Sequence, residues 1–357
     1  MPGCGGATDH ADRADRGAQY AFRGSDLTLD HASGRAREVS IAFQSDKRPE
    51  EYVELSRLAE RAGFDVISVY HDLFFQPAIY PLLLMAQATE RVRLGPAALN
   101  PFTLHPVEIA GQIAALDAVS AGRAYLGLVR GSWLEALAMK TSRPLTAIRE
   151  AVEVIRRLLA GDEAGFAGEQ FSLTPGARLR YEPVRSEVPL MIGTWGVRLA
   201  AYAGEVAREL KIGGTANPDL VPVMRSRLGN DRVRVVVGAV TVVDADGLAA
   251  RQLAREEAAL YFPVVAGLDP TLEVPAGLVE EVRRLVDAGE RAAAGRLIPN
   301  RLLEKLAFAG TPAEVARQAA ALYEAGAARV EFGTPHGLTP RRGVELLADR
   351  VLPELGL

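Results

Sequence analysis

The sequence predicts an α/β fold, a single (β/α)8 TIM barrel over residues 38–357, on two observations. Short apolar, β-branched runs alternate eight times with amphipathic runs, a pattern typical of parallel strands joined by helices. The length of 357 residues suits one barrel with insertions, since barrels extend from about 250 residues upward. The polar, Gly-rich stretch 1–37 has little to bury, so we expect it to form a flexible N-terminal arm.

Each expected strand is an apolar run bounded by turn residues or by a helix. The strands are expected at residues 39–44, 64–70, 92–99, 123–129, 188–193, 210–214, 232–243 and 329–333. The helices are expected at residues 50–63, 81–90, 107–122, 145–159, 196–207, 218–228, 311–326 and 341–355. The first helix shows the pattern clearly, because Tyr52, Leu55 and Ala59 share one face before Gly63 ends it.

Two segments are longer than a plain barrel requires. Residues 161–188 follow the fourth helix and combine turn residues with short apolar runs, which predicts a small hairpin insertion. Residues 247–310 follow the seventh strand and are rich in Ala, Arg and Glu, so we expect a mainly helical excursion there.

Composition narrows the choice of partners. A net charge of −4 argues against a nucleic-acid surface, and the sequence contains no apolar run long enough for a membrane span. Cys4 is the only cysteine, so we expect neither an intrachain disulfide nor a cysteine metal site. HExxH and calcium-type spacings are also absent, and we expect no metal. We expect a cytoplasmic protein that binds a small molecule.

The segment Arg91–Pro106 marks the third strand and the polar loop after it. An apolar run from Val92 to Leu99 stops at Asn100-Pro101, and a second proline follows His105. A buried strand therefore leads into a short, stiff loop at the barrel end that carries active sites.

Rare side chains gather after the expected strands. His71, His105 and His336 follow strands two, three and eight, while Trp133 and Trp195 follow strands four and five. Strand ends of a barrel meet at one rim, so we expect these five residues to share a pocket that accepts a flat ring.

His71 and Asp72 form the best catalytic pair. A histidine beside a carboxylate can move a proton or hydrogen-bond to a cofactor edge. In the alternative interpretation, Asp72 caps a short turn and His71 is a satisfied rim residue. For His105 a structural role is favoured, because it precedes a proline that begins a helix, and His336 is ambiguous.

Glycines follow two strands that we expect to be neighbours. Gly127 and Gly131 lie in LGLVRGS, and Gly193 and Gly196 lie in IGTWG just before a helix. Exposed backbone N–H groups at such positions favour a phosphate. The chain has no GxGxxG after strand one and no GxxxxGK[ST], so Rossmann and P-loop sites are excluded.

Several motifs together resemble a known family over about Val39–Leu357. They are RAGFDVISVYHD, TERVRLGPAALNPFTLHP, LDAVSAGRAYLGLVRGS, VPLMIGTWG, GTPAEVARQAAALYEAGAARVEFGTPHG and VLPEL. In this order they resemble the bacterial-luciferase-like flavin/deazaflavin oxidoreductases, nearest to the branch similar to coenzyme F420-dependent methylenetetrahydromethanopterin reductase. The resemblance is specific for fold and cofactor class and unspecific for substrate.

The resemblance implies where a coenzyme would bind. The phosphate of F420 or FMN would be held by the segments matching Val129–Ser132 and Gly193–Gly196. A non-prolyl cis peptide behind the deazaflavin ring would fall at Ala97-Ala98. The implied cofactor contacts are Ala97, Ala98, Asn100, Val129, Arg130, Gly131, Gly193, Thr194, Trp195 and Gly196.

Two departures from the family pattern bear on catalysis. Family members commonly have Asp-His after strand two, whereas this chain has His71-Asp72. Sugar-phosphate-oxidising relatives carry a glutamate where this chain has Ser132, which speaks against their acid/base mechanism. Asp46 is a candidate to replace that carboxylate, and the only argument for it is its position after strand one.

The resemblance leads us to expect an F420-dependent oxidoreductase. It would transfer hydride between the deazaflavin and a small organic substrate with a C=C or C=N bond, with His71, Asp72 and Ser132 supplying hydrogen bonds or a proton. Alternatives are an FMN-dependent luciferase-like monooxygenase and a non-catalytic flavin-binding protein. A homodimer is expected from the family alone.

Overall fold

A computed structural model of the chain describes residues 37–139 and 141–356. The predicted arm at residues 1–37 lies outside this range except for Arg37. The described residues all belong to one compact unit. No helix within residues 37–139 and 141–356 has the length and apolar character needed to cross a bilayer.

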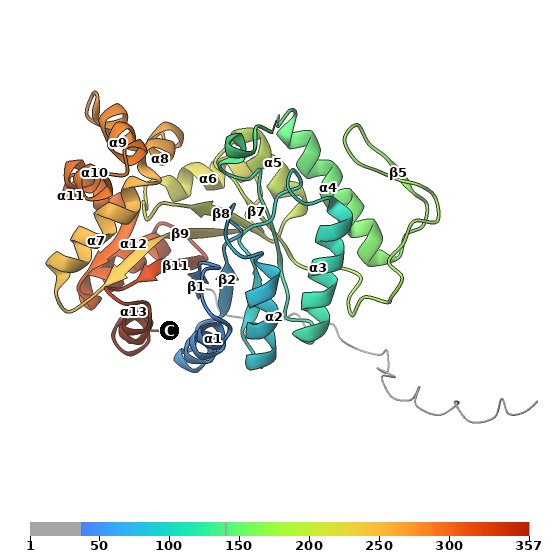
Figure 1. Cartoon of the computed structure of the whole chain (residues 1–357), viewed down its shortest axis with the longest axis horizontal. Coiled ribbons are helices and arrows are strands. Elements are labelled where there is room, and N and C mark those ends of the chain that lie inside the picture. The colour runs from blue at the N-terminus through green and yellow to red at the C-terminus, as the bar shows by residue number, and fades with distance from the viewer. Residues whose placement is uncertain (1–36, 140, 357) are drawn as a thin grey trace, which may run out of the picture. The chain divides into compact units, whose positions relative to one another are not determined.

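Eight parallel strands close into a barrel, which confirms the predicted TIM fold. In chain order they are β1 (Glu38–Phe43), β2 (Val66–Val69), β3 (Arg93–Pro96), β4 (Leu126–Leu128), β7 (Leu190–Gly193), β8 (Glu209–Gly213), β9 (Arg234–Val243) and β11 (Arg329–His336). The order around the barrel is β3-β2-β1-β11-β9-β8-β7-β4, and parallel bridges Leu94–Ala124 and Leu99–Leu128 join β3 to β4. The first and last strands therefore lie side by side, blue beside red in Figure 1.

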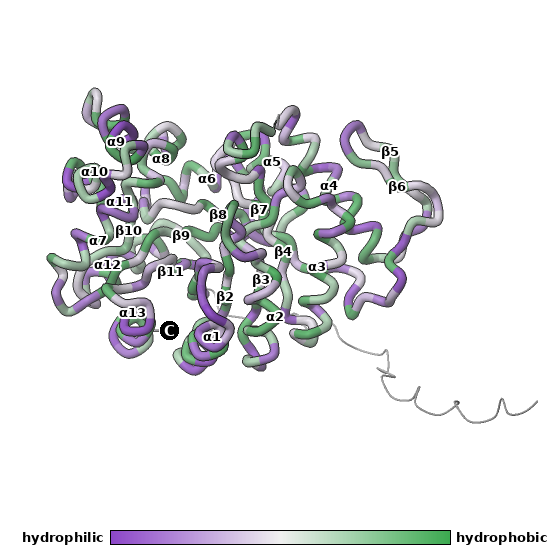
Figure 2. The backbone as a smooth tube through the Cα atoms, viewed as in Figure 1, coloured by the Kyte–Doolittle hydropathy of each residue, from purple (hydrophilic) through white to green (hydrophobic). Residues whose placement is uncertain are grey.

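Helices surround the barrel and bury one face each. They are α1 (Pro49–Ala62), α2 (Ile79–Ala88), α3 (Pro106–Val119), α4 (Pro144–Ala160), α5 (Val197–Val206), α6 (Leu220–Leu228), α7 (Gly247–Ala259), α12 (Pro312–Glu324) and α13 (Pro340–Leu346). As predicted, α1 buries Tyr52, Leu55 and Ala59 and ends at Gly63, whose φ of 92° suits glycine. Green and purple stretches along α1 in Figure 2 show the same two-sided pattern.

Both predicted insertions are present. The hairpin after α4 pairs β5 (Phe166–Ala167) with β6 (Ser172–Leu173) in antiparallel register. The excursion after β9 contains α8 (Phe262–Leu268), α9 (Leu278–Asp287), α10 (Arg291–Leu297) and α11 (Asn300–Leu306). These helices and α7 bury a second hydrophobic cluster beside the barrel.

Three boundaries differ from the sequence prediction. Residues 307–310 form β10 (Ala307–Gly310), a ninth strand of the barrel sheet that pairs with the long β9. This segment was predicted to be helical because AFAG has no strand-like alternation. Strand β11 continues beyond Gly333 to His336 through a cis Thr334-Pro335 bond. The predicted last helix is divided into three consecutive parts. They are α13, a π-helical turn at Leu347–Val351, and α14 (Leu352–Glu354), which contains Pro353.

Charged side chains fill the middle of the barrel. Arg329 is fully buried and pairs with Glu209, while Lys211 pairs with Glu331. Ser68 donates to the Glu331 carboxylate at 2.6 Å and lies 2.8 Å from the Tyr125 hydroxyl. Burial acts to raise the pKa of Glu331, but Lys211, Arg329 and these hydrogen bonds outweigh it and lower that pKa. The interior is therefore a paired ionic network.

Removing one partner of this network should destabilise the barrel strongly. We expect Arg329→Met to lower the free energy of unfolding by about 3–5 kcal/mol, because it leaves the Glu209 carboxylate buried without its cation. Adding Glu209→Gln should restore much of the loss. Urea unfolding followed by circular dichroism measures both. Arg341→Met, at an exposed pair with Glu345, is the control, and equal stability of Arg329→Met and this control would contradict the prediction.

Candidate active site at the barrel mouth

The end of β2 sends alternate side chains to opposite sides of the sheet. Ser68 faces the barrel interior, where it binds Glu331, and Tyr70 lies on the same side with its ring 5.3 Å from the Lys211 ammonium. Asp72 also faces inward and accepts a hydrogen bond from the Gln44 amide at 2.7 Å. His71 lies between them in the sequence and is partly exposed.

The predicted catalytic pair is therefore divided between two environments. The Nδ1 atom of His71 accepts a hydrogen bond from the Ala78 backbone N–H at 3.3 Å, which ties the ring to the start of α2. Burial lowers the pKa of His71, and the Asp72 charge opposes part of this effect. Burial raises the pKa of Asp72, while Gln44, His71 and Lys211 act to lower it. Both side chains are partly exposed, and Asp72 is the one whose charge interacts with Lys211 inside the barrel.

The Ala97-Ala98 peptide that follows β3 is cis, as the family resemblance implied. Ala97 is partly exposed and Ala98 is buried. The buried Asn100 accepts hydrogen bonds at its side-chain oxygen from the N–H groups of Phe102 (3.1 Å) and Thr103 (2.9 Å). This turn fixes the loop after the cis peptide.

The loop after β4 lies directly against the β3 loop. The Val129 N–H donates to the Leu99 carbonyl at 2.9 Å. Gly131 has a φ of 94°, and a β-carbon there would stand 3.0 Å from the Asn100 side chain. Arg130 and Ser132 are exposed, and Arg130 lies 3.5 Å from the Thr141 hydroxyl. The predicted segments after strands three and four thus form one continuous surface.

The loop after β7 completes this rim. A β-carbon on Gly193 would approach the Val129 side chain to 2.5 Å, so glycine lets the two loops pack together. The Thr194 hydroxyl accepts from the Gly196 N–H at 3.0 Å, just before α5 begins. The Trp195 carbonyl accepts from Arg227 at 2.6 Å. Because β4 pairs with β7, the two predicted phosphate loops are neighbours.

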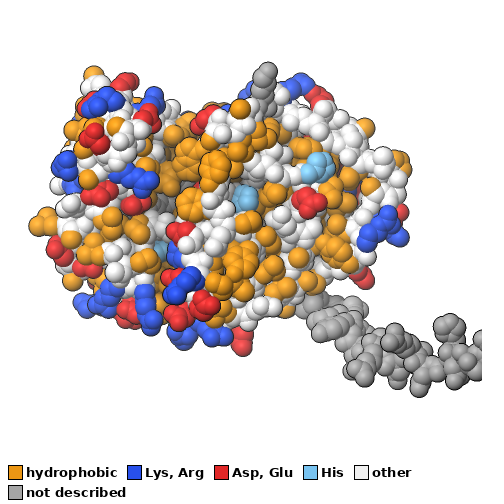
Figure 3. Space-filling view, in the orientation of Figure 1, with side chains coloured by type: hydrophobic (Ala, Val, Ile, Leu, Met, Phe, Trp, Pro, Cys, Tyr) orange, Lys and Arg blue, Asp and Glu red, His pale blue; other side chains and the backbone are white. Residues whose placement is uncertain are grey.

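The backbone at the end of β8 is open beside these loops. Gly213 ends β8, two residues after the inward-facing Lys211, and a β-carbon built on it would meet no atom within 4 Å. Large exposed hydrophobic side chains in the loops after β2 and β4 include Phe74, Phe75 and Trp133. Figure 3 shows hydrophobic side chains gathered over the middle of one face. Small residues, an open mouth and polar loop backbones fit a ring cofactor with a phosphate.

The predicted pocket of three histidines and two tryptophans does not form as a unit. His105 begins α3, accepting from the Val107 N–H at 3.2 Å, and contacts the Phe171 ring, as its predicted structural role requires. His336 is completely buried inside β11, with its Nε2 atom 3.1 Å from the Ala42 carbonyl. The sequence prediction placed His336 after a strand because Pro335 suggested that the strand ended.

Two aromatic residues at the mouth were missed from the sequence. Tyr70 was assigned to strand two as a core residue, although its position two after Ser68 could have indicated an inward side chain. Tyr261 precedes α8 and packs on Trp133 with ring centroids 6.0 Å apart. Burial, then the Asp72 charge, raises the pKa of Tyr261 to about 12. Nothing local in the helical excursion indicated that Tyr261 would return to the barrel mouth.

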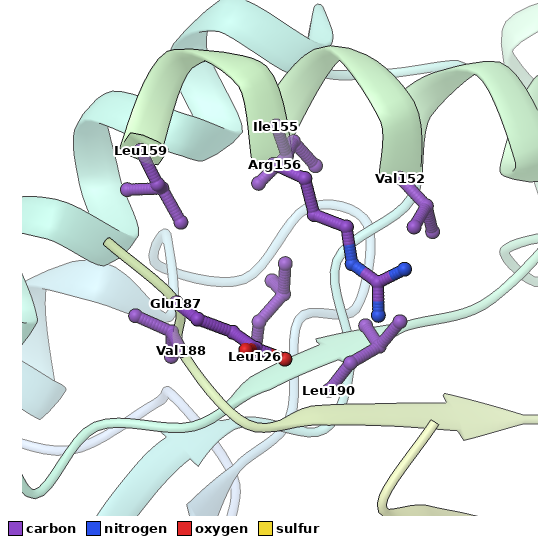
Figure 4. Close-up of a pocket in the computed structure, with 8 residues that line it drawn as sticks. All are labelled: Leu126, Val152, Ile155, Arg156, Leu159, Glu187, Val188 and Leu190. Carbon is purple, nitrogen blue, oxygen red and sulfur yellow. The ribbon is translucent and has the colours of Figure 1, made fainter. Parts of the chain in front are cut away.

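A separate small cavity lies at the opposite end of the barrel strands. Figure 4 shows it between α4 and the starts of β4 and β7, with Leu126 and Leu190 below and Arg156 and Glu187 at its edge. It contains none of the predicted site residues. Active sites of β/α barrels lie at the C-terminal strand ends, so we assign the site to the mouth.

The fold and the rim define a barrel enzyme of the oxidoreductase class. Residues 27–329 match the family described as luciferase-like monooxygenase, and the chain belongs to that family. The 5,10-methylenetetrahydromethanopterin reductase of Archaeoglobus fulgidus is 28% identical, over 89% of this chain and 99% of the relative. The F420-dependent glucose-6-phosphate dehydrogenase of Rhodococcus erythropolis is 31% identical, over 47% of this chain and 55% of its own length.

Solved structures support the same fold. The coenzyme F420-dependent tetrahydromethanopterin reductase from Methanopyrus kandleri superposes with a TM-score of 0.80 at 23% identity, covering 89% of this chain and 99% of its own. An F420-dependent secondary alcohol dehydrogenase in complex with an F420-acetone adduct gives a TM-score of 0.71 at 21% identity, with the same coverage. The predicted family resemblance is confirmed.

The buried His336 should make stability depend on pH. Burial lowers the pKa of His336 to about 3, below the unfolded value near 6.5, so the unfolded chain binds the proton more readily. Stability should therefore be full above pH 6.5 and fall as the pH is lowered toward 3, by about 2 kcal/mol from this group at pH 5. Urea unfolding of wild type and His336→Gln at pH 7 and pH 5 isolates the effect. Parallel losses in both proteins would show that His336 makes no such contribution.

Proposed function

We propose that the protein is a coenzyme F420-dependent oxidoreductase acting on a small organic substrate with a C=C or C=N bond. The observation that carries the proposal is the rim itself. The loop after β3 and the glycine loops of β4 and β7 adjoin an open mouth at Gly213. Relatives similar over nearly the whole chain are reductases of 5,10-methylenetetrahydromethanopterin, and other matched relatives are named F420-dependent.

We assign the coenzyme contacts to the residues that the family resemblance implied. Backbone groups of Val129, Arg130, Gly131 and Ser132, together with Gly193, Thr194, Trp195 and Gly196, would hold the phosphate at adjacent strand ends. Ala97, Ala98 and Asn100 would lie behind and beside the ring. When bound, the deazaflavin supplies or accepts a hydride at C5.

The remaining chemistry belongs to protein side chains. Asp72, held by Gln44, faces the mouth and can position a substrate N–H or O–H group. The neighbouring His71 acts through its charge to lower the pKa of Asp72. Ser132 is exposed at the rim and can donate a hydrogen bond. The barrel would orient the two reacting carbons.

Two other functions remain testable alternatives. An FMN-dependent luciferase-like monooxygenase is favoured by the family match. A non-catalytic flavin-binding protein is favoured by the reversed His71-Asp72 order. We also propose a cytoplasmic location and a homodimer, which size-exclusion chromatography with light scattering tests.

Coenzyme titration should separate these functions. We expect the protein to quench F420 fluorescence at micromolar concentrations and to leave FMN fluorescence unchanged, because several matched relatives are named as F420-dependent. Tight FMN binding without F420 binding would refute the proposal. Oxygen consumption with reduced FMN would then favour the monooxygenase, and binding without turnover across C=N and C=C compounds would favour the non-catalytic protein.

Substitution of the β2-end pair should affect hydride transfer unequally. We expect Asp72→Ala to lower kcat by about 10²-fold, since Asp72 faces the mouth, and His71→Ala to lower it less, since its Nδ1 is occupied by Ala78. Stopped-flow oxidation of the reduced coenzyme measures both. His105→Ala, at the start of α3, is the control. If neither β2-end variant differs from that control, the catalytic assignment is wrong.

A further inference from the structure

The Tyr70 side chain spans the barrel mouth from β2 toward β11. A β-carbon on Gly333 of β11 would lie 2.5 Å from the Tyr70 hydroxyl oxygen, so only glycine leaves room for this group. Strand β1 separates the two strands in the sheet. The hydroxyl therefore stands over the inner face of the barrel, above the ionic network.

The Tyr70 ring contacts the ammonium group of Lys211 in the ionic network. The Lys211 ammonium lies 5.3 Å from the Tyr70 ring centroid and is itself fixed by Glu331. A cation beneath an aromatic face attracts it and restricts its orientation. The backbone of Tyr70 is also tied at both ends, donating to the Phe43 carbonyl at 3.0 Å and accepting from the Ser45 hydroxyl at 3.3 Å.

The Tyr70 hydroxyl makes no hydrogen bond to another described residue, and Tyr70 is partly exposed. The fully packed tyrosines differ: the Tyr125 hydroxyl meets Ser68, and Tyr323 donates to the Glu38 carbonyl at 2.6 Å. Burial raises the pKa of Tyr70 well above its usual range, with Glu331, Tyr261, Asp72 and Tyr125 adding to this effect. The group is therefore a neutral, partly exposed donor with no partner among the described protein residues, so a bound ligand could accept from it.

We propose that the Tyr70 hydroxyl donates a hydrogen bond to the pyrimidine edge of the bound coenzyme and so stabilises its reduced form. This inference rests on the proposed function. When a deazaflavin or flavin ring gains a hydride, negative charge develops at the N1 and C2 carbonyl edge. A donor held in place before the reaction interacts more strongly with that charged edge than with the neutral oxidised ring. FMN and F420 share this edge, so the inference holds for either coenzyme.

The test compares coenzyme affinities and needs no substrate. Dissociation constants of oxidised and reduced F420, and of oxidised and reduced FMN, are measured by anaerobic calorimetry for wild type and Tyr70→Phe. This variant keeps the ring above Lys211 and removes only the oxygen. Tyr323→Phe, which removes a hydroxyl at the opposite end of the barrel, is the matched control, and circular dichroism verifies that both variants are folded.

We expect Tyr70→Phe to weaken reduced-coenzyme binding by about 10- to 100-fold and oxidised-coenzyme binding by less than about threefold. The midpoint potential of the bound coenzyme should become more negative, and Tyr323→Phe should change neither quantity. Equal weakening of both redox forms would overturn the inference, because it would show that Tyr70 only shapes the pocket. Unchanged affinities would overturn it as well. If wild type binds neither coenzyme, the proposed function itself has failed.

Discussion

The paired charges inside the barrel are the constraint on which the mouth depends. Arg329 and Glu331 extend inward from β11, and Glu209 and Lys211 extend inward from β8, so each strand supplies one cation and one carboxylate to the other. A buried ion has a large desolvation cost unless its partner is in place. The network therefore specifies how β8, β11 and β2 are aligned, and this alignment sets Tyr70 above Lys211 and leaves Gly213 facing open space.

The sequence predicted the repeated features of the fold well. Strand and helix alternation has a physical period that each segment reveals by itself, and the hairpin after α4 was equally visible from its turn residues. It could not predict β10, because the four residues AFAG form a strand only when the long β9 offers a free edge. The interior charges were also unpredictable, since Lys211 and Glu331 are 120 positions apart and become partners only when the barrel closes.

The site was predicted less completely than the fold. The glycine loops and the cis Ala97-Ala98 peptide came from local motifs, and the structure brings these segments together at adjacent strands. Tyr261 and His336 could not be placed in the same way. Tyr261 reaches the mouth through an insertion, and His336 is buried because β11 continues past Pro335. Long-range packing decides both positions.

The reversed His71-Asp72 order gains a physical meaning from the alternation of β2. Side chains two residues apart share one side of a strand, so Ser68, Tyr70 and Asp72 face the interior. The family order, Asp-His, would place an imidazole at the inward position that Asp72 occupies here. The reversal therefore replaces an imidazole, which can both donate and accept a hydrogen bond, with the Asp72 carboxylate. When ionised, that carboxylate can only accept. A fixed donor at that mouth must then come from another residue, and the unpartnered hydroxyl of Tyr70 lies two positions away on the same side.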